Sequence, residues 1–132
     1  MHRLGFLKNF ITNPNIQVGD FTYYDDPDGI DNFENKNVLY HFDFVGDKLI
    51  IGKFCQIATG IKFIMNGANH GLQGFTTYPF KIFGKPFDEV PLLSDNKGNT
   101  LVGNDVWIGY DVTIMPGVVI GNGGKRSMNP IF

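Results

Sequence analysis

A histidine near the middle of the chain has the surroundings of a catalytic base. His70 ends the run Met65–His70 (MNGANH), where a regular sequence pattern gives way to an irregular stretch. The pKa of an imidazole lies near neutrality, so it can take a proton from a hydroxyl whose oxygen attacks a carbonyl. A single histidine in a loop is more often a surface or capping residue. Its position beside a long loop favours the catalytic interpretation.

Two further residues bear on the chemistry. Trp107 is the only tryptophan and takes an outward position in its repeat, where it either covers a corner of the fold or meets a partner surface. Cys55 takes the small position of its repeat with no base beside it, which predicts a buried, inert thiol.

His2 and His41 lack companion ligands, so we expect no metal site. Neither a phosphate loop nor a dinucleotide fingerprint is present.

The elements that would position these residues follow from a six-residue repeat. Each copy has an aliphatic residue, a small residue, two free positions, a small or aliphatic residue and one more free position. The repeats begin at Ile51, Ile57, Val102, Ile108, Ile114 and Ile120, and a lone copy begins at Val18. This period fits neither an α-helix nor an alternating strand.

The repeat predicts an all-β fold, a left-handed parallel β-helix in which each short strand forms one side of a triangular prism. The aliphatic residue would point into the prism, and the small residue beside it would sit near a crowded corner. Three repeats close one coil, and each coil buries its face against its neighbours. The alternative is a β-sandwich with chance glycine spacing, which the shared phase from Val102 to Ile120 disfavours.

Breaks in the phase locate the loops of a single domain spanning residues 1–132. Phe63 and Val102 are 39 residues apart, which is not a multiple of six, so a long excursion is expected at about 78–99. Val18 and Ile51 are 33 apart, which predicts a second excursion at about 24–48. Long loops on a rigid scaffold are usually functional. The tail 124–132 lacks the aliphatic spacing.

Composition sets the broad class. Of the 132 residues, 42% are hydrophobic, which suffices for a core, and the net charge of -2 gives no reason to expect nucleic acid or a membrane as partner. One cysteine excludes an internal disulfide, and neither a signal peptide nor an apolar run of roughly 20 residues is seen. A cytoplasmic protein is the resulting expectation.

Over about residues 16–123 the sequence resembles the xenobiotic acetyltransferases of the hexapeptide-repeat superfamily, which include streptogramin A acetyltransferases and hexapeptide-type chloramphenicol acetyltransferases. The motifs at 63–70 and 103–109 are highly specific together. The matching stretches are VGDFTYYD (18–25), IGKFC (51–55), FIMNGANH (63–70), TYPF (77–80), GNDVWIG (103–109) and the run 114–121.

The resemblance implies an acetyl-CoA-dependent O-acetyltransferase that modifies a hydroxyl of a xenobiotic or antibiotic. It further implies a homotrimer with active sites between subunits and direct transfer within a ternary complex, without an acyl-enzyme. His70 matches the catalytic base of the family. Tyr23, Tyr40 and Phe42 match the acceptor side. Trp107 lies beside the acetyl-CoA and acceptor tunnel, and Gly109 and Tyr110 are assigned with it to the acetyl-CoA site.

The sequence departs from the family after Gly123. Relatives continue with further repeats that supply part of the CoA groove, so the chain is expected to be truncated or frame-shifted. The stretch Leu92–Asn96 also fits the family poorly, which leaves the acceptor open. Two alternatives therefore stand beside the antibiotic acetyltransferase. One is a non-catalytic β-helical trimer, and the other is an acetyltransferase of a sugar or small metabolite.

Overall fold

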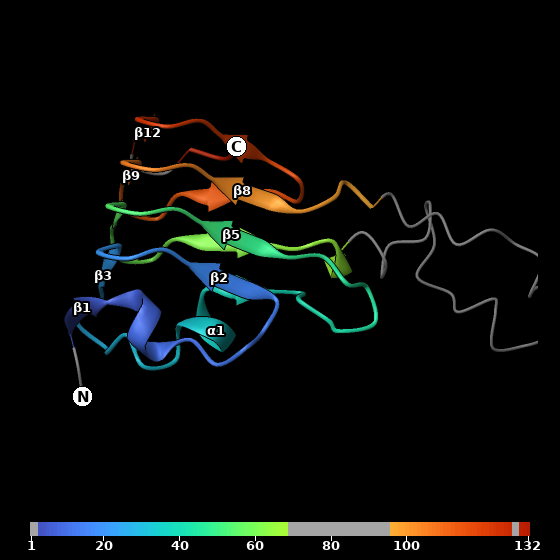
Figure 1. Cartoon of the computed structure of the whole chain (residues 1–132), viewed down its shortest axis with the longest axis horizontal. Helices are drawn as coiled ribbons and strands as arrows, with labels where there is room; N and C mark the ends of the chain where they lie inside the picture. Colours follow the sequence, from blue (N-terminus) through green and yellow to red (C-terminus); the bar gives the residue numbers. More distant parts are fainter. Residues whose placement is uncertain (1–2, 69–95, 128–129) are drawn as a thin grey trace, which may run out of the picture.

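The structure is a computed structural model that describes residues 3–68, 96–127 and 130–132 (Figure 1). Within these residues the chain is mostly β-sheet, with one short 3₁₀ helix η1 (Leu7–Phe10) and one single-turn helix α1 (Phe33–Lys36). The strands are β1 (Leu4–Phe6), β2 (Ile16–Val18), β3 (Tyr23–Asp25), β4 (Val38–Leu39), β5 (Leu49–Ile51), β6 (Gln56–Ile57), β7 (Lys62–Ile64), β8 (Thr100–Val102), β9 (Trp107–Ile108), β10 (Thr113–Ile114), β11 (Val119–Ile120) and β12 (Lys125–Arg126).

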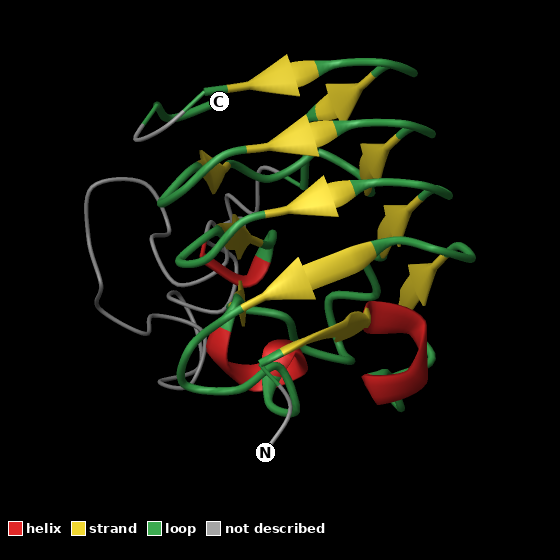
Figure 2. Ribbon diagram, turned by 90° about the vertical axis from the view of Figure 1, so that its left-hand side faces the viewer, coloured by secondary structure: helices red, strands yellow, loops and turns green. Residues whose placement is uncertain are grey.

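The strands form three sheets that the chain visits in turn. The four-stranded sheet has the order β11-β8-β5-β2, the five-stranded sheet β1-β3-β6-β9-β12, and the three-stranded sheet β10-β7-β4. Strands β2, β3 and β4 make the first coil, β5 to β7 the second, β8 to β10 the third, and β11 and β12 open the fourth. Figure 2 shows the coils stacked one above another. The all-β, parallel arrangement expected from the six-residue repeat is confirmed.

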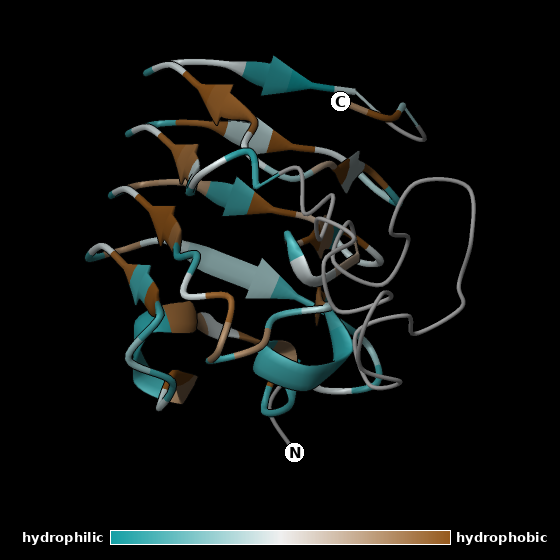
Figure 3. Ribbon diagram, turned by 90° about the vertical axis from the view of Figure 1, so that its right-hand side faces the viewer, coloured by the Kyte–Doolittle hydropathy of each residue, from teal (hydrophilic) through white to brown (hydrophobic). Residues whose placement is uncertain are grey.

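The first residue of each repeat faces the interior, as the sequence predicts. Ile51 pairs with Val102 in the four-stranded sheet, and Ile57 pairs with Ile108 in the five-stranded sheet. All four are buried, with at most 3% of the side chain exposed. Alternation along a strand then turns the next residue outward. Figure 3 shows the hydrophobic residues recurring from coil to coil up the stack.

The small residue of the repeat is required by close backbone approach at one corner. A Cβ atom on Gly52 would lie 2.5 Å from Asn104 Oδ1 and 2.6 Å from the carbonyl oxygen of Gly103 in the coil above. The same Asn104 oxygen accepts a hydrogen bond from the Lys53 amide at 2.8 Å. The corner therefore has room for the backbone and for an asparagine side chain that hydrogen-bonds to the neighbouring coil, but a side chain at position 52 would not fit.

The tail follows the fourth coil although it lacks the aliphatic spacing. Arg126 pairs with Ile108, and Ile131 forms a bridge with Thr113, so Arg126 and Phe132 continue the inward columns. The Arg126 guanidinium lies over the Phe132 ring, 4.8 Å from its centroid. The aliphatic stem of an arginine can cover apolar surface while its charged head contacts an aromatic face.

The first coil differs from the simple repeat. Strand β1 pairs with β3 in the antiparallel sense and so covers the edge that β3 would otherwise expose. The stretch 24–48, expected to be an excursion, contains α1 and also β4, which pairs in parallel with β7. Part of that stretch therefore belongs to the coil. Most of the expected excursion at 78–99 lies outside the described residues.

A buried carboxyl group ties α1 to the first coil. Asp26 is 1% exposed, and it accepts hydrogen bonds from the Tyr24 hydroxyl at 2.9 Å and the Lys36 ammonium at 2.8 Å. Burial alone would raise the pKa of Asp26, but the Lys36 ammonium, the Asp28 amide and the Tyr24 hydroxyl together hold it below its usual value. The folded state thus favours the ionised carboxylate.

Acid is expected to remove this contribution to stability. Because the pKa of Asp26 is lower in the folded state, the contribution is present above the unfolded value of about 3.9 and is lost as the pH falls through the folded value. Asp26→Asn should lower the free energy of unfolding at pH 7 by about 1–3 kcal/mol. It should also reduce the acid dependence between pH 7 and pH 3. Urea unfolding at both values tests this, and an unchanged pH dependence in Asp26→Asn contradicts it.

Candidate functional site

The outward face of the five-stranded sheet carries a row of polar and aromatic side chains. Tyr23, Gln56, Trp107 and Lys125 are register partners on β3, β6, β9 and β12. Each directly precedes an inward residue, so the alternation of the strand turns it outward. Trp107 is 39% exposed, which fits the outward position expected for it. The sheet therefore places four side chains that can donate hydrogen bonds next to one another on its outward face.

A cavity of about 180 Å³ lies on this face. It brings together three residues singled out from the sequence, Tyr23, Trp107 and Tyr110. The complete lining is Tyr23, Asp25, Gln56, Ile57, Ala58, Trp107 and Tyr110. Three aromatic side chains around a small concave space can hold an apolar or planar group, and their polar tips can orient it.

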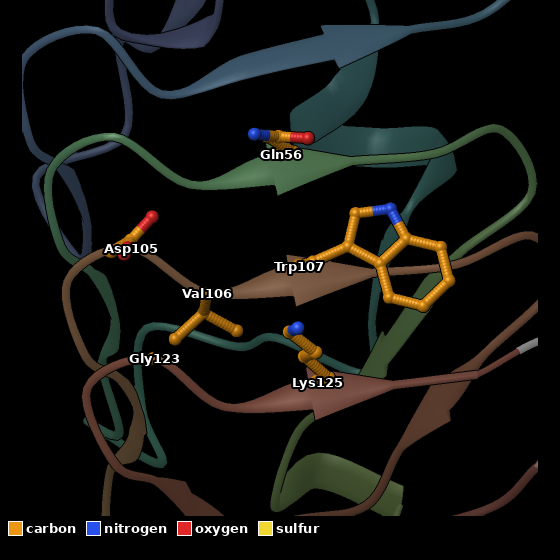
Figure 4. A pocket seen from close by; sticks show the side chains of 6 residues that line it. All are labelled: Gln56, Asp105, Val106, Trp107, Gly123 and Lys125. Atoms are coloured by element: carbon orange, nitrogen blue, oxygen red, sulfur yellow. The ribbon is translucent and has the colours of Figure 1, made fainter.

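A larger cavity of about 560 Å³ lies farther along the same face, towards the fourth coil (Figure 4). Trp107 and Gln56 line both cavities, so the two are neighbours. The lining is Gln56, Asp105, Val106, Trp107, Gly123 and Lys125. Here the Trp107 indole is accompanied by one ammonium and one carboxyl group. This cavity is thus more polar in chemistry than the aromatic one beside it.

Gly109 has a structural place next to these cavities. Its amide donates a hydrogen bond to the carbonyl oxygen of Arg126 at 2.7 Å, and the residue is buried. It joins the third coil to the fourth and lines neither cavity, whereas the adjacent Tyr110 lines the smaller one.

Tyr40 and Phe42 form a second cluster, after the end of β4. The Gly67 amide donates to the Tyr40 carbonyl oxygen at 3.0 Å. A Cβ atom on Gly67 would collide with that oxygen and lie 2.5 Å from the Phe42 ring. Tyr40 is 53% exposed and Phe42 42%, and the Phe42 and Phe44 rings stack at 5.4 Å. The segment is therefore pressed against the first part of the motif that ends at His70.

His70 itself lies outside the described residues. Residues 65–68 of its motif are described, and they contact the Tyr40 segment as stated above. The two clusters occupy different parts of the coil. One faces outward from the five-stranded sheet, and the other adjoins β4 and β7. Neither of the two cavities on the five-stranded sheet is lined by Tyr40 or Phe42.

Sequence reasoning missed Gln56 and Lys125 in the cavity lining. Both hold the same repeat position as Trp107, one coil below and one coil above. Extending the phase from Trp107 would have pointed to them. Cys55, in contrast, is buried as expected, and its thiol donates to the Gly103 carbonyl oxygen at 3.1 Å.

Across 3–68, 96–127 and 130–132 there is no group of three or more His, Cys, Asp or Glu side chains that could hold a metal ion. In that part of the chain no helix has the length and apolar character needed to cross a membrane.

Comparison with known proteins places this geometry in context. No family model matches the chain. It is 61% identical over 96 residues to a probable macrolide acetyltransferase from Lysinibacillus sphaericus, covering 70% of this chain and 53% of the relative. It is 55% identical over 93 residues to a virginiamycin A acetyltransferase from Staphylococcus aureus, covering 70% and 41%.

A third relative matches almost the whole chain. A chloramphenicol acetyltransferase from Klebsiella aerogenes is 38% identical over 133 residues, covering 92% of this chain and 61% of the relative. The chain thus spans about half the length of the curated relatives it matches. All three relatives are acetyltransferases named for an antibiotic, and their shared sequence shows that the chain belongs to the xenobiotic acetyltransferase family.

Proposed function

We propose that this chain transfers an acetyl group from acetyl-CoA to a hydroxyl group of an antibiotic of the kinds named for its relatives. The observation that carries the proposal is the aromatic cavity in which Tyr23, Trp107 and Tyr110 converge. These residues were selected from the sequence alone, and they belong to strands of two different coils or to the turn that follows.

The proposed chemistry needs two proton transfers and one exchange of bonds at the thioester carbonyl carbon. The His70 imidazole takes the proton of the acceptor hydroxyl as its oxygen attacks the thioester carbonyl. The bond from the carbonyl carbon to sulfur then breaks, and the CoA thiolate leaves and takes up the proton from the His70 imidazolium. An acetyl ester and free CoA are the products. Tyr23, Tyr40 and Phe42 serve the acceptor, while Trp107, Gly109 and Tyr110 serve acetyl-CoA.

The proposal includes a left-handed β-helix that works as a homotrimer. The handedness is suggested by the six-residue repeat and the family resemblance. Trimerisation is supported by the separation of the two clusters. In one chain Tyr40 and Phe42 pack beside Gly67, away from the cavities on the five-stranded sheet. A neighbouring copy that brings its own Met65–His70 segment to that sheet would complete the site.

Sedimentation tests this assembly directly. At micromolar concentration we expect a mass of three chains, because an exposed Trp107 and an incomplete site both call for a partner surface. A mass equal to one chain contradicts the trimer. Lys53→Ala, on an outward corner, should sediment like the unchanged protein.

Acetyl transfer is tested by mixing the protein with acetyl-CoA and each antibiotic class in turn. Release of free CoA thiol should depend on the antibiotic, and mass spectrometry should find one added acetyl group on it. An assembled protein that yields no acetylated product with a macrolide, a streptogramin A or chloramphenicol rejects the proposal. Acetylation of a sugar alone would move the acceptor to another class.

A further inference from the structure

The larger cavity on the five-stranded sheet has a cation beside its aromatic ring. Among the described residues that line it, Lys125 alone carries a positive charge, and Lys125 on β12 is the register partner of Trp107 on β9. Figure 4 shows the Lys125 side chain next to the indole, with Asp105 at the other end of the lining. In the part of the chain that the structure describes, no ion pair joins Lys125 to a carboxyl group. The ammonium is therefore available to a bound anion.

The corner beside this cavity carries smaller side chains in the later coils. The equivalent corner residues of the four coils all have φ between 56° and 71°, namely Phe21, Phe54, Asp105 and Gly123. Each of the last three donates its amide to the carbonyl oxygen just before the corner residue of the preceding coil. The two phenylalanines are more than half exposed, whereas a Cβ atom on Gly123 would meet nothing within 4 Å. The fourth coil therefore leaves open space where the first two carry a ring.

Size distinguishes the two neighbouring cavities. Sites for small molecules usually have a volume of about 300–1,000 Å³. The cavity at Lys125, of about 560 Å³, lies within this range, and the aromatic cavity of about 180 Å³ does not. The smaller cavity has room for a small group such as acetyl, and the larger one can hold a longer part of a molecule. Because Trp107 and Gln56 line both cavities, one elongated molecule can occupy the two together.

We propose that Lys125 binds a phosphate group of the CoA part of acetyl-CoA in the larger cavity. The inference rests on the proposed function, which makes acetyl-CoA the donor. A hydrogen bond from an ammonium to a phosphate oxygen is about twice as strong as one between neutral groups. The Asp105 carboxyl group repels an anion, which favours the Lys125 end of the cavity for the phosphate. Lys125 follows Gly123, after which the sequence departs from the family, so the resemblance assigns it no role.

Binding can be followed through Trp107, which lines the cavity and is the only tryptophan of the chain. Its fluorescence is titrated with CoA and with pantetheine, which has the same thiol arm but no phosphate, and calorimetry measures the same two Kd values independently. Lys125→Ala should raise the Kd for CoA about 10-fold and leave the Kd for pantetheine unchanged. Lys125→Arg keeps the positive charge and should retain most of the affinity for CoA.

Two further variants test whether charge at this cavity is the cause. Asp105→Asn removes the carboxylate, and asparagine tolerates the positive φ of 56° at this corner. It should lower the Kd for CoA by about 2-fold, the opposite direction to Lys125→Ala. Lys62→Ala is the matched control, because Lys62 is an exposed lysine on β7 of the three-stranded sheet and lines neither cavity. Both of its Kd values should stay unchanged.

The outcomes separate this inference from the proposed function. Weaker CoA binding in Lys125→Ala, with pantetheine binding unchanged, supports the inference even if no antibiotic is acetylated, in which case only the proposed transfer fails. An equal Kd for CoA in Lys125→Ala and the unaltered protein overturns the inference. If the unaltered protein also acetylates an antibiotic, the transferase proposal then stands without Lys125. An unaltered protein that binds pantetheine as tightly as CoA likewise overturns the phosphate contact.

Discussion

Ile108→Asp is expected to prevent the chain from folding. Ile108 is fully buried and lies between Ile57 and Arg126 in an inward column of the five-stranded sheet. A buried carboxylate without a partner costs several kcal/mol, about as much as the whole stability of a small domain. Circular dichroism should show loss of the sheet signal at temperatures where the unaltered protein is folded.

Two controls separate the position from the chemistry of the substitution. Val119→Asp introduces the same carboxylate at an outward position that is 63% exposed, and it should melt close to the unaltered protein. Lys53→Ala, at an outward corner, should do the same. If Ile108→Asp melts at the same temperature as Lys53→Ala, the inward phase of the repeat is wrong.

The repeat predicted the core because its six-residue period determines which side chains point into the interior of each coil. A residue that recurs every six positions faces the same interior in every coil. The six aliphatic residues that start the repeats are all buried, namely Ile51, Ile57, Val102, Ile108, Ile114 and Ile120. The parallel pairing between coils follows from the same spacing. For this part of the molecule, local pattern and tertiary structure agree.

The first and last coils were harder to read because other residue types take the inward positions. Tyr24 stands below Ile57, and it is fully buried with its hydroxyl bonded to Asp26. Arg126 stands above Ile108, and its stem rather than an aliphatic side chain continues the column. A pattern based on aliphatic residues does not detect a tyrosine or an arginine, so β3 and β12 were not expected.

The candidate site was predictable where a residue differed from the pattern and hidden where it did not. Trp107 stood out as an unusual outward side chain, whereas Gln56 is an ordinary one. Their contact depends on the register between β6 and β9, which are separated by the 69–95 segment.

His70→Ala is expected to lower kcat by about 10²–10⁴-fold, with a smaller effect on the acceptor KM. A hydroxyl is a poor nucleophile at neutral pH, so removing its proton during attack on the thioester is the barrier that a positioned base lowers. The lost interaction belongs mainly to the transition state, and kcat should therefore carry the effect. Steady-state kinetics over a range of acceptor concentrations measure both constants.

Cys55→Ser is the control that separates this mechanism from a thiol nucleophile. Cys55 is fully buried inside the coil, and its thiol already donates to the Gly103 carbonyl oxygen at 3.1 Å. A hydroxyl can make the same hydrogen bond, so turnover should be largely retained. A loss in Cys55→Ser as large as that in His70→Ala would instead favour covalent catalysis through the thiol.

The chain spans about half the length of its relatives. The turnover of the unaltered protein and of His70→Ala should therefore be compared in two pairs of proteins. One pair of proteins is the chain and its His70→Ala variant. The other pair is joined to the sequence of the Lysinibacillus sphaericus relative that lies outside the match, and turnover should rise if that sequence completes the acetyl-CoA site. If the extended protein acetylates a hydroxylated antibiotic and its His70→Ala variant does so at the same rate, His70 is not the base. The proton must then pass to another group that contacts the acceptor hydroxyl.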